Sequence, residues 1–409
     1  MLLLRLAWRN LWRGWRRSVV VMSAVAVGLC ATLVLVGWSK GMMYQMRDNA
    51  INTVLAHVAV QAAGYQADPD VRRNLGADAA QLRALLQTRE GVHASARLRG
   101  EGLVQSARRS LRVSVIGVDP GAERSVSVVP DTLVAGKFLA VPRGQNSRQL
   151  PAIVIGQAMA ERLHVDLGDR LVLHVPGEAG LGAFRVRGIY RTNSTEFDRS
   201  VAYMRLGTAK TLFAVDGPTE IALALERPDE AAAVQAWLRE QTDPARIEVL
   251  RWQERQPILA SLIEYVGSIY WIFYFVVFVA MAFGIANALL MAIYERIREF
   301  GVMRSLGLKS GRLVAMVLLE SLLLTLAGTA LGLGIGLPLI AWLGRVGIDL
   351  SIYASALEGY GIGSTIYLAV DPGDTLWPVA LAVITALLAA LWPAIKAARL
   401  RPAEALRAV

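Results

Sequence analysis

The sequence has a single cysteine, Cys30, in 409 residues. One thiol cannot form an internal disulfide framework or a cysteine-based zinc cluster. Cys30 lies within an apolar run, where the ordinary role of a cysteine is that of a small buried hydrophobe. Leu29 stands where a lipobox needs a small side chain. A disulfide-stapled scaffold and a thiolate metal site are therefore excluded.

Catalytic motifs are also missing. There is no G-x-x-x-x-G-K-[ST] sequence, because Gly136-Lys137 lacks both the upstream glycine and the hydroxyl residue. The four histidines show no H-E-x-x-H spacing, and no G-x-S-x-G is present. We expect no catalytic residue, no metal site and no cofactor in this chain, so ATP and Mg²⁺ would have to be bound by a partner.

Charge is scarce: 19% of the residues are charged, against roughly a quarter in soluble domains. The apolar residues gather in four blocks: Val19 to Trp38, Tyr265 to Tyr294, Leu313 to Gly344 and Thr375 to Ile395. At about 1.5 Å per helical residue, each block can cross a hydrocarbon core of about 30 Å. The first block could instead be a cleaved signal peptide, but its length and the absence of a cleavage site favour a retained anchor.

Lysine and arginine orient the chain. They cluster before the first block, between the second and third and after the fourth, whereas the connection between the third and fourth has only Arg345. By the positive-inside rule, both termini are cytoplasmic and the long insert lies outside. The predicted order is a cytoplasmic-face helix at 1–17, membrane helices at 18–38, 262–294, 312–344 and 375–395, outside segments at 39–258 and 345–374, and cytoplasmic segments at 295–311 and 396–409.

The first 17 residues predict an amphipathic helix on the inner leaflet, in contact with membrane lipid. Its tryptophans and arginines fall on adjoining faces: Trp8, Trp12, Trp15, Arg5, Arg9 and Arg13. A plain topology signal would use the same arginines, and the two interpretations are compatible.

The insert gives no support for nucleic-acid binding, because its 28 basic and 24 acidic residues are intermixed. Its most informative stretch, from Ile153 to Tyr190, consists of an apolar strand at 153–155, a short helix at Met159 to Leu163, a Gly168-Asp169 turn and two alternating strands at 171–175 and 184–190. This order predicts an α+β domain.

The cytoplasmic segment 295–311 predicts a helix leaving the membrane, a turn at Gly301 and a second helical piece ended by Gly307. Apolar residues recur on it at spacings of three: Ile297, Phe300, Met303 and Leu306. Such a ridge suits docking into a partner's groove, although a solvated linker would also fit.

The run from Glu295 to Gly307 resembles the coupling segment of the FtsX-like, MacB-type ABC transporter permease family, which includes macrolide exporters and the lipoprotein-releasing Lol permeases. The end of the chain, Pro393 to Arg407, is similar to the family's carboxyl-terminal signature. Gly136-Lys137-Phe138 and the stretch from Ile153 to Gly188 resemble its periplasmic core domain.

The resemblance implies an α-helical protein of the bacterial inner membrane, with four transmembrane helices (one, then three) and a large α+β periplasmic domain between the first two. It also implies two paired permeases, as a homodimer or a heterodimer, that transmit force from a cytoplasmic ABC ATPase. The residues matched to ATPase contact are Glu295, Arg298, Glu299, Gly301, Arg304 and Gly307.

The third apolar block has two further features. Gly328, Gly332 and Gly336 recur every four residues, which allows another helix to approach closely, either in a dimer or within the chain. Glu320 lies inside the same block, where an acid should face protein or water. Its similarity to the family pattern favours pairing with a basic cytoplasmic end over a substrate or proton role.

Three functions stay open: movement of lipoproteins or other lipid-like substrates, efflux of drugs or peptides by the same mechanism, and FtsX-like regulation of a cell-wall hydrolase. The size of the insert favours the first two. A periplasmic chaperone or adaptor is a further candidate partner. The short glycine-rich connection from Pro176 to Ala183 differs, however, from the longer hook that grips the chaperone in one Lol permease.

Overall fold

The computed structural model describes residues 15–139, 150–176, 180–306, 308–353, 356 and 362–399. The chain divides into two compact units. The helical unit comprises Met1–Met43, Ile263–Ile348 and Ile366–Val409, and the α/β unit comprises Tyr44–Leu262 and Asp349–Thr365. The predicted outside loop at 345–374 is thus shared between the two units.

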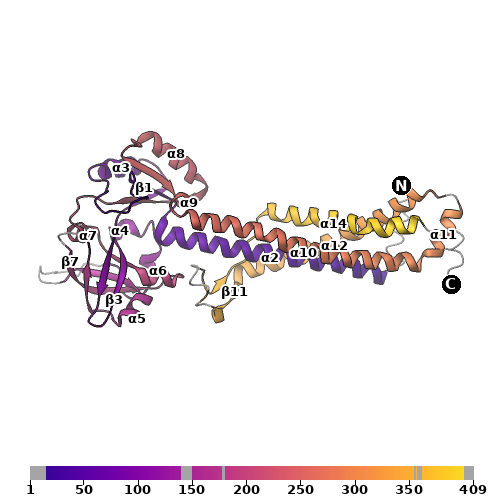
Figure 1. Ribbon diagram of the computed structural model, residues 1–409, viewed down its shortest axis with the longest axis horizontal. Coiled ribbons are helices and arrows are strands. Elements are labelled where there is room, and N and C mark those ends of the chain that lie inside the picture. Colours follow the sequence, from indigo (N-terminus) through magenta and orange to yellow (C-terminus); the bar gives the residue numbers. More distant parts are fainter. Residues whose placement is uncertain are drawn as a thin grey trace. The chain divides into compact units, whose positions relative to one another are not determined.

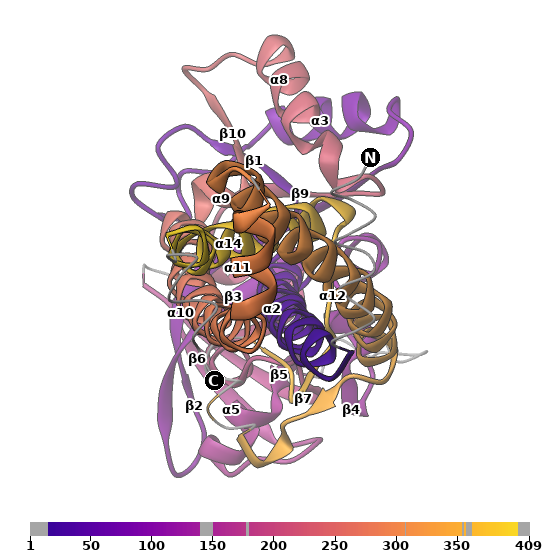
Figure 2. The same cartoon turned by 90° about the vertical axis from the view of Figure 1, so that its right-hand side faces the viewer.

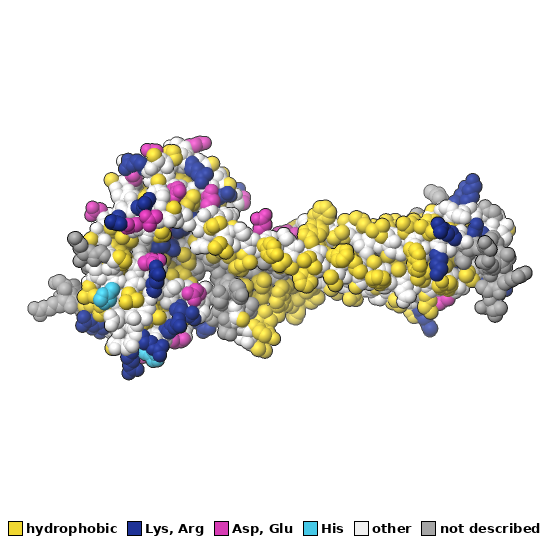
Figure 3. All heavy atoms as spheres, viewed as in Figure 1, with side chains coloured by type: hydrophobic (Ala, Val, Ile, Leu, Met, Phe, Trp, Pro, Cys, Tyr) yellow, Lys and Arg dark blue, Asp and Glu magenta, His cyan; other side chains and the backbone are white. Residues whose placement is uncertain are grey.

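Within the described residues, the helical unit has four helices that are long and apolar enough to cross a membrane (Figure 1). They are α2 (Trp15–Ala50), α10 (Pro257–Glu295), α12 (Ser310–Val346) and α14 (Pro372–Ala398). The apolar surface along them is nearly continuous (Figure 3). The 36 residues of α2 span about 54 Å, more than a hydrocarbon core of about 30 Å. Both α2 and α10 therefore extend beyond the predicted spans and continue unbroken into residues of the α/β unit.

The helices pack through small side chains. Buried alanines recur every four residues along α14, at Ala382, Ala386 and Ala390, and they share a core with Val25 of α2 and Ile285 of α10. The view along the bundle shows these helices grouped with α12 (Figure 2). A stripe of small residues lets helices approach closely where dispersion contacts hold them together.

The α/β unit contains a ten-stranded mixed sheet in the order β10-β1-β9-β2-β3-β8-β5-β7-β4, with β6 paired to β2 and β7. Its strands are β1 (Val58–Ala62), β2 (Val92–Gln105), β3 (Ser110–Val118), β4 (Leu133–Gly136), β5 (Ala152–Gly156), β6 (Arg170–His174), β7 (Leu181–Tyr190), β8 (Val201–Arg205), β9 (Glu220–Leu225) and β10 (Ile247–Arg251). Its helices are α3 (Asp78–Gln87), α4 (Pro120–Glu123), α5 (Gln157–Leu163), α6 (Thr195–Ser200), α7 (Leu206–Phe213), α8 (Ala231–Gln241) and α9 (Trp252–Arg255). Two short strands, β11 (Ile348–Asp349) and β12 (Thr365–Ile366), pair separately.

Two of the apolar cores in the described residues pack helices α3, α5, α7 and α8 against this sheet. One joins α3 and α8 to β1, β9 and β10 around Val60, Leu82 and Leu238. The other joins α5 and α7 to the remaining part of the sheet around Ile155 and Phe184. Together with the four membrane-length helices, this mixed unit confirms the predicted fold class.

Candidate coupling site

The segment between α10 and α12 forms one helix, α11 (Ile297–Ser305). The helical conformation is interrupted at Arg296, whose φ of −109° and ψ of 17° are not helical. Gly301 lies buried inside α11, so the predicted turn at Gly301 is wrong. The early break lets α11 fold back so that its apolar side packs against the ends of the neighbouring helices.

This packing takes up the two middle residues of the predicted docking ridge. Phe300 is only 2% exposed and shares a core with Ile293, Leu313 and Ala397, and Met303 packs against the same core. Ile297 is half-buried and lies outside this core, and Leu306, which is 82% exposed, is open to a partner. The interpretation of the whole ridge as a docking surface is therefore wrong, because its middle belongs to the chain's own core.

The exposed side chains around α11 include the charged Glu295, at the end of α10, Arg298 and Glu299, and the apolar Val302 and Leu306. Of these, only Leu306 belongs to the ridge. We call these five residues the coupling face. Basic side chains also gather at this end of the bundle (Figure 3). Val302 was not predicted to contact a partner, because it lies off the ridge of three-residue spacing.

The other residues matched to ATPase contact lie elsewhere. Arg304 donates from Nη1 to the carbonyl oxygen of Ala398 at 2.9 Å, at the carboxyl end of α14. It thus satisfies a helix-terminal carbonyl within this chain, where a cation is also favoured by the helix dipole. Gly307 lies outside the described residues.

Glu320 pairs with a base at the end of the bundle that carries α11. Its Oε2 lies 3.5 Å from Nη1 of Arg296, and each side chain is 16% exposed. Arg296 also contacts Glu299, at 2.9 Å from Nε to Oε2. Arg296 therefore links α12 to the first turn of α11, at the point where the helix is interrupted.

The glycine stripe of α12 faces α2 of the same chain. A Cβ at Gly328 would lie 2.8 Å from the carbonyl oxygen of Met22 and from Cβ of Val25. At Gly332 it would lie 3.0 Å from the carbonyl oxygen of Ala26, and at Gly336 it would lie 3.3 Å from Leu33. The structure thus places the stripe in intrachain helix packing.

The membrane-surface prediction falls mostly outside the described residues, as do Trp8, Trp12, Arg5, Arg9, Arg13 and the carboxyl-terminal signature beyond residue 399. Trp15 is described and is 60% exposed, with the guanidinium of Arg16 5.7 Å from its ring centroid.

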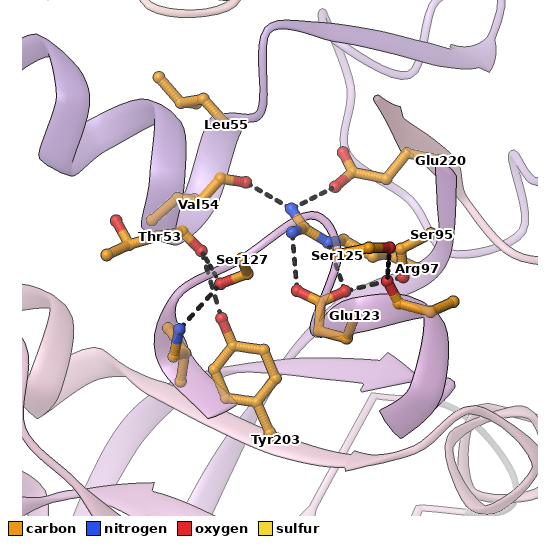
Figure 4. A network of polar contacts seen from close by, with 12 residues as sticks. Thr53, Val54, Leu55, Ser95, Arg97, Glu123, Ser125, Ser127, Tyr203 and Glu220 are labelled. Carbon is orange, nitrogen blue, oxygen red and sulfur yellow. Dashed lines mark hydrogen bonds and ion pairs between the residues drawn. The ribbon is translucent and has the colours of Figure 1, made fainter. Parts of the chain in front are cut away.

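In the α/β unit, five charged side chains meet where α2 ends and α10 begins: Arg97, Arg99, Glu123, Glu220 and Arg255. Glu123 and Glu220 are fully buried and Arg97 is 1% exposed. Arg97 donates to both carboxylate oxygens of Glu123, at 3.1 and 2.7 Å (Figure 4). This cluster was not predicted from the sequence. The signal that could have indicated it is a charged residue inside an apolar strand, since a buried ion requires a partner.

Glu220 gives this cluster a pH dependence. Burial opposes its ionised form, but Arg255, Arg99 and Arg97 outweigh burial and lower the pKa of Glu220 from 4.5 to about 2. Because the folded pKa lies below the unfolded value, ionised Glu220 stabilises the fold by about 3 kcal/mol above pH 4.5. This contribution is lost as the pH falls from 4.5 towards 2.

We therefore expect the stability of the α/β unit to fall between pH 4.5 and 2 and the Glu220→Gln variant to show a flatter dependence there. Denaturant unfolding of the purified chain, followed by far-ultraviolet circular dichroism at each pH, measures this. Parallel curves for the two proteins would contradict the assignment.

Comparison with known proteins shows the family to which this architecture belongs. The family model described as "MacB-like periplasmic core domain" matches residues 18–241, and "FtsX-like permease C-terminal" matches residues 271–402. The chain belongs to the FtsX-like, MacB-type ABC permease family. It is therefore a permease subunit of a type VII ABC transporter and a multi-pass inner-membrane protein. Membership implies an ABC ATPase and a second permease as partners.

Two relatives of this permease match along nearly their whole length. The lipoprotein-releasing system transmembrane protein LolC of Neisseria meningitidis serogroup B is 25% identical over 95% of this chain and 94% of its own. The corresponding LolE of Haemophilus influenzae is 23% identical over the same shares. Among solved structures, the periplasmic region of MacB from Actinobacillus actinomycetemcomitans covers 53% of this chain and 97% of its own, with 11% identity and a TM-score of 0.36.

Proposed function

We propose that this permease couples ATP hydrolysis by a separate cytoplasmic ATPase to motion of its periplasmic domain, and that it thereby extracts lipoproteins or similar lipid-anchored substrates from the inner membrane. The observation that carries the substrate class is the match to LolC and LolE across 95% of this chain. The match to the MacB export protein of Chlorobaculum tepidum covers only 30% of this chain.

In this proposal both termini are cytoplasmic and the α/β unit is periplasmic. The coupling face meets the ATPase: the carboxylates of Glu295 and Glu299 and the guanidinium of Arg298 supply charge-assisted hydrogen bonds, and Val302 and Leu306 supply apolar contact. A second permease completes the transporter, and a periplasmic chaperone or adaptor receives the substrate.

Depletion of the permease, followed by proteomics of the inner and outer membranes, tests the substrate class. We expect lipoproteins to accumulate in the inner membrane, because their acyl anchors cannot leave the bilayer without an energy source. Unchanged lipoproteins with new drug or peptide sensitivity would support efflux instead. Altered cell-wall hydrolase activity without any retained cargo would support a regulatory function.

A further inference from the structure

We propose that the buried cluster of Arg97, Arg99, Glu123, Glu220 and Arg255 is the joint that fixes both membrane helices, α2 and α10, to the periplasmic sheet, with Glu220 and Arg255 as its positioning residues. We call it the arginine joint. This inference rests on the proposed transmission of motion and names the residues that perform it in the periplasmic domain.

The joint holds the end of α2 by its main chain. Beyond Ala50 the helix continues as a π-helical turn, Ile51–Leu55, and stops at Ala56, whose φ is 57°. Arg97 donates to the carbonyl oxygen of Val54 at 2.7 Å, and Arg255 donates to that of Leu55 at 2.6 Å (Figure 4 shows the Val54 contact). These carbonyls lack helical partners and carry the negative end of the helix dipole.

The guanidinium groups of the joint need the end of α2 as a source of hydrogen-bond acceptors. Three guanidinium groups meet two carboxylates, so the cluster holds one surplus positive charge. The carbonyls of Val54 and Leu55 are the additional acceptors, and Arg99 also donates to Val54, at 3.1 Å. Moving the end of α2 away would leave buried guanidinium groups with fewer acceptors, which is costly.

The same cluster holds the start of α10. Arg255 is the last residue of α9, two positions before Pro257 begins α10. Its Nη2 lies 2.5 Å from Oε2 of Glu220, the first residue of β9. Because β9 pairs with β1 and β2 inside the sheet, a displacement of either helix reaches the central strands through short, buried, charged contacts.

Hydrogen exchange measured on the complete transporter tests the joint. The full chain is purified with its ATPase in nanodiscs and compared without nucleotide and trapped with ATP and vanadate. In the wild type we expect trapping to change exchange in both α11 and β9. In the double variant Glu220→Gln/Arg255→Gln we expect the change in α11 to persist and the change in β9 to be lost.

The double variant is chosen because it removes one carboxylate and one guanidinium and so keeps the net charge of the cluster, which protects folding. The matched control, Glu101→Gln/Arg112→Gln, removes an exposed ion pair between β2 and β3 of the same domain and should behave as the wild type. The variant Arg255→Lys keeps the charge but loses the second donor, and we expect it to lose the β9 response as well.

The outcomes separate the joint from the function on which it rests. A β9 response that persists in the double variant overturns the joint and leaves the proposed transmission standing. A wild type that responds in α11 but nowhere in the periplasmic domain overturns the transmission itself. If the cluster only stabilises the domain, the β9 response should follow the thermal stability of the variants. If Arg255→Lys is stable and its β9 still responds normally, the joint is also contradicted.

Discussion

Replacing Gly328 or Gly332 by leucine should separate α12 from α2 and abolish ATP-coupled function. The new Cβ would meet main-chain oxygens of Met22 or Ala26 at 3.0 Å or less, and main chain cannot rotate away as a flexible side chain can. Overpacking of this kind costs about 1–3 kcal/mol, or more where backbone must move. Thermal unfolding of the purified chain and ATP hydrolysis by the assembled transporter measure the two effects.

The same helix supplies a matched control. A Cβ at Gly334 would meet nothing within 4 Å, so Gly334→Leu should leave both stability and hydrolysis near those of the wild type. The intrachain assignment fails if Gly328→Leu and Gly334→Leu behave alike. It also fails if Gly332→Leu leaves the chain fully stable while removing only its association with a second permease.

The second large effect is expected at α11. Phe300→Ala removes a side chain that is 2% exposed, so it should destabilise the bundle by about 3–5 kcal/mol through the cavity that it leaves. Leu306→Ala removes a side chain that is 82% exposed, so it should leave the bundle stable and weaken binding of the ATPase. Thermal stability of the permease alone and its co-purification with the ATPase separate the two.

This pair also tests the orientation of α11. If Leu306→Ala lowers stability as much as Phe300→Ala, the exposed face has been misassigned. If Phe300→Ala leaves stability unchanged and instead releases the ATPase, the docking ridge predicted from spacing would regain its support.

Periodicity in the sequence identified strands and helices where one face was plainly apolar. The strands predicted at 153–155, 171–175 and 184–190 correspond to β5, β6 and β7. Strands β8, β9 and β10 were not predicted, since short apolar runs such as Val201–Arg205 give no alternation that separates strand from buried helix. The pairing order of the sheet depends on long-range register, which no local pattern contains.

For the candidate sites too, the sequence indicated some features and only the structure showed their partners. Residue type and place were enough to single out Glu320 and the glycines, because an acid or a bare helix face within an apolar span requires a partner. Their partners, Arg296 and α2, are separated from them by 24 residues and by hundreds of residues respectively, so only folding could identify them.

By itself, the sequence determined the membrane character and the four spans of this permease, because hydrophobic length and charge placement are local properties of a chain. The tertiary structure decided which side of α11 is open and where the charged strand residues meet. Both depend on burial, and burial is set by neighbours that the fold brings together. Arg97, Glu220 and Arg255 lie far apart in the sequence, and only the folded sheet joins them at the end of α2.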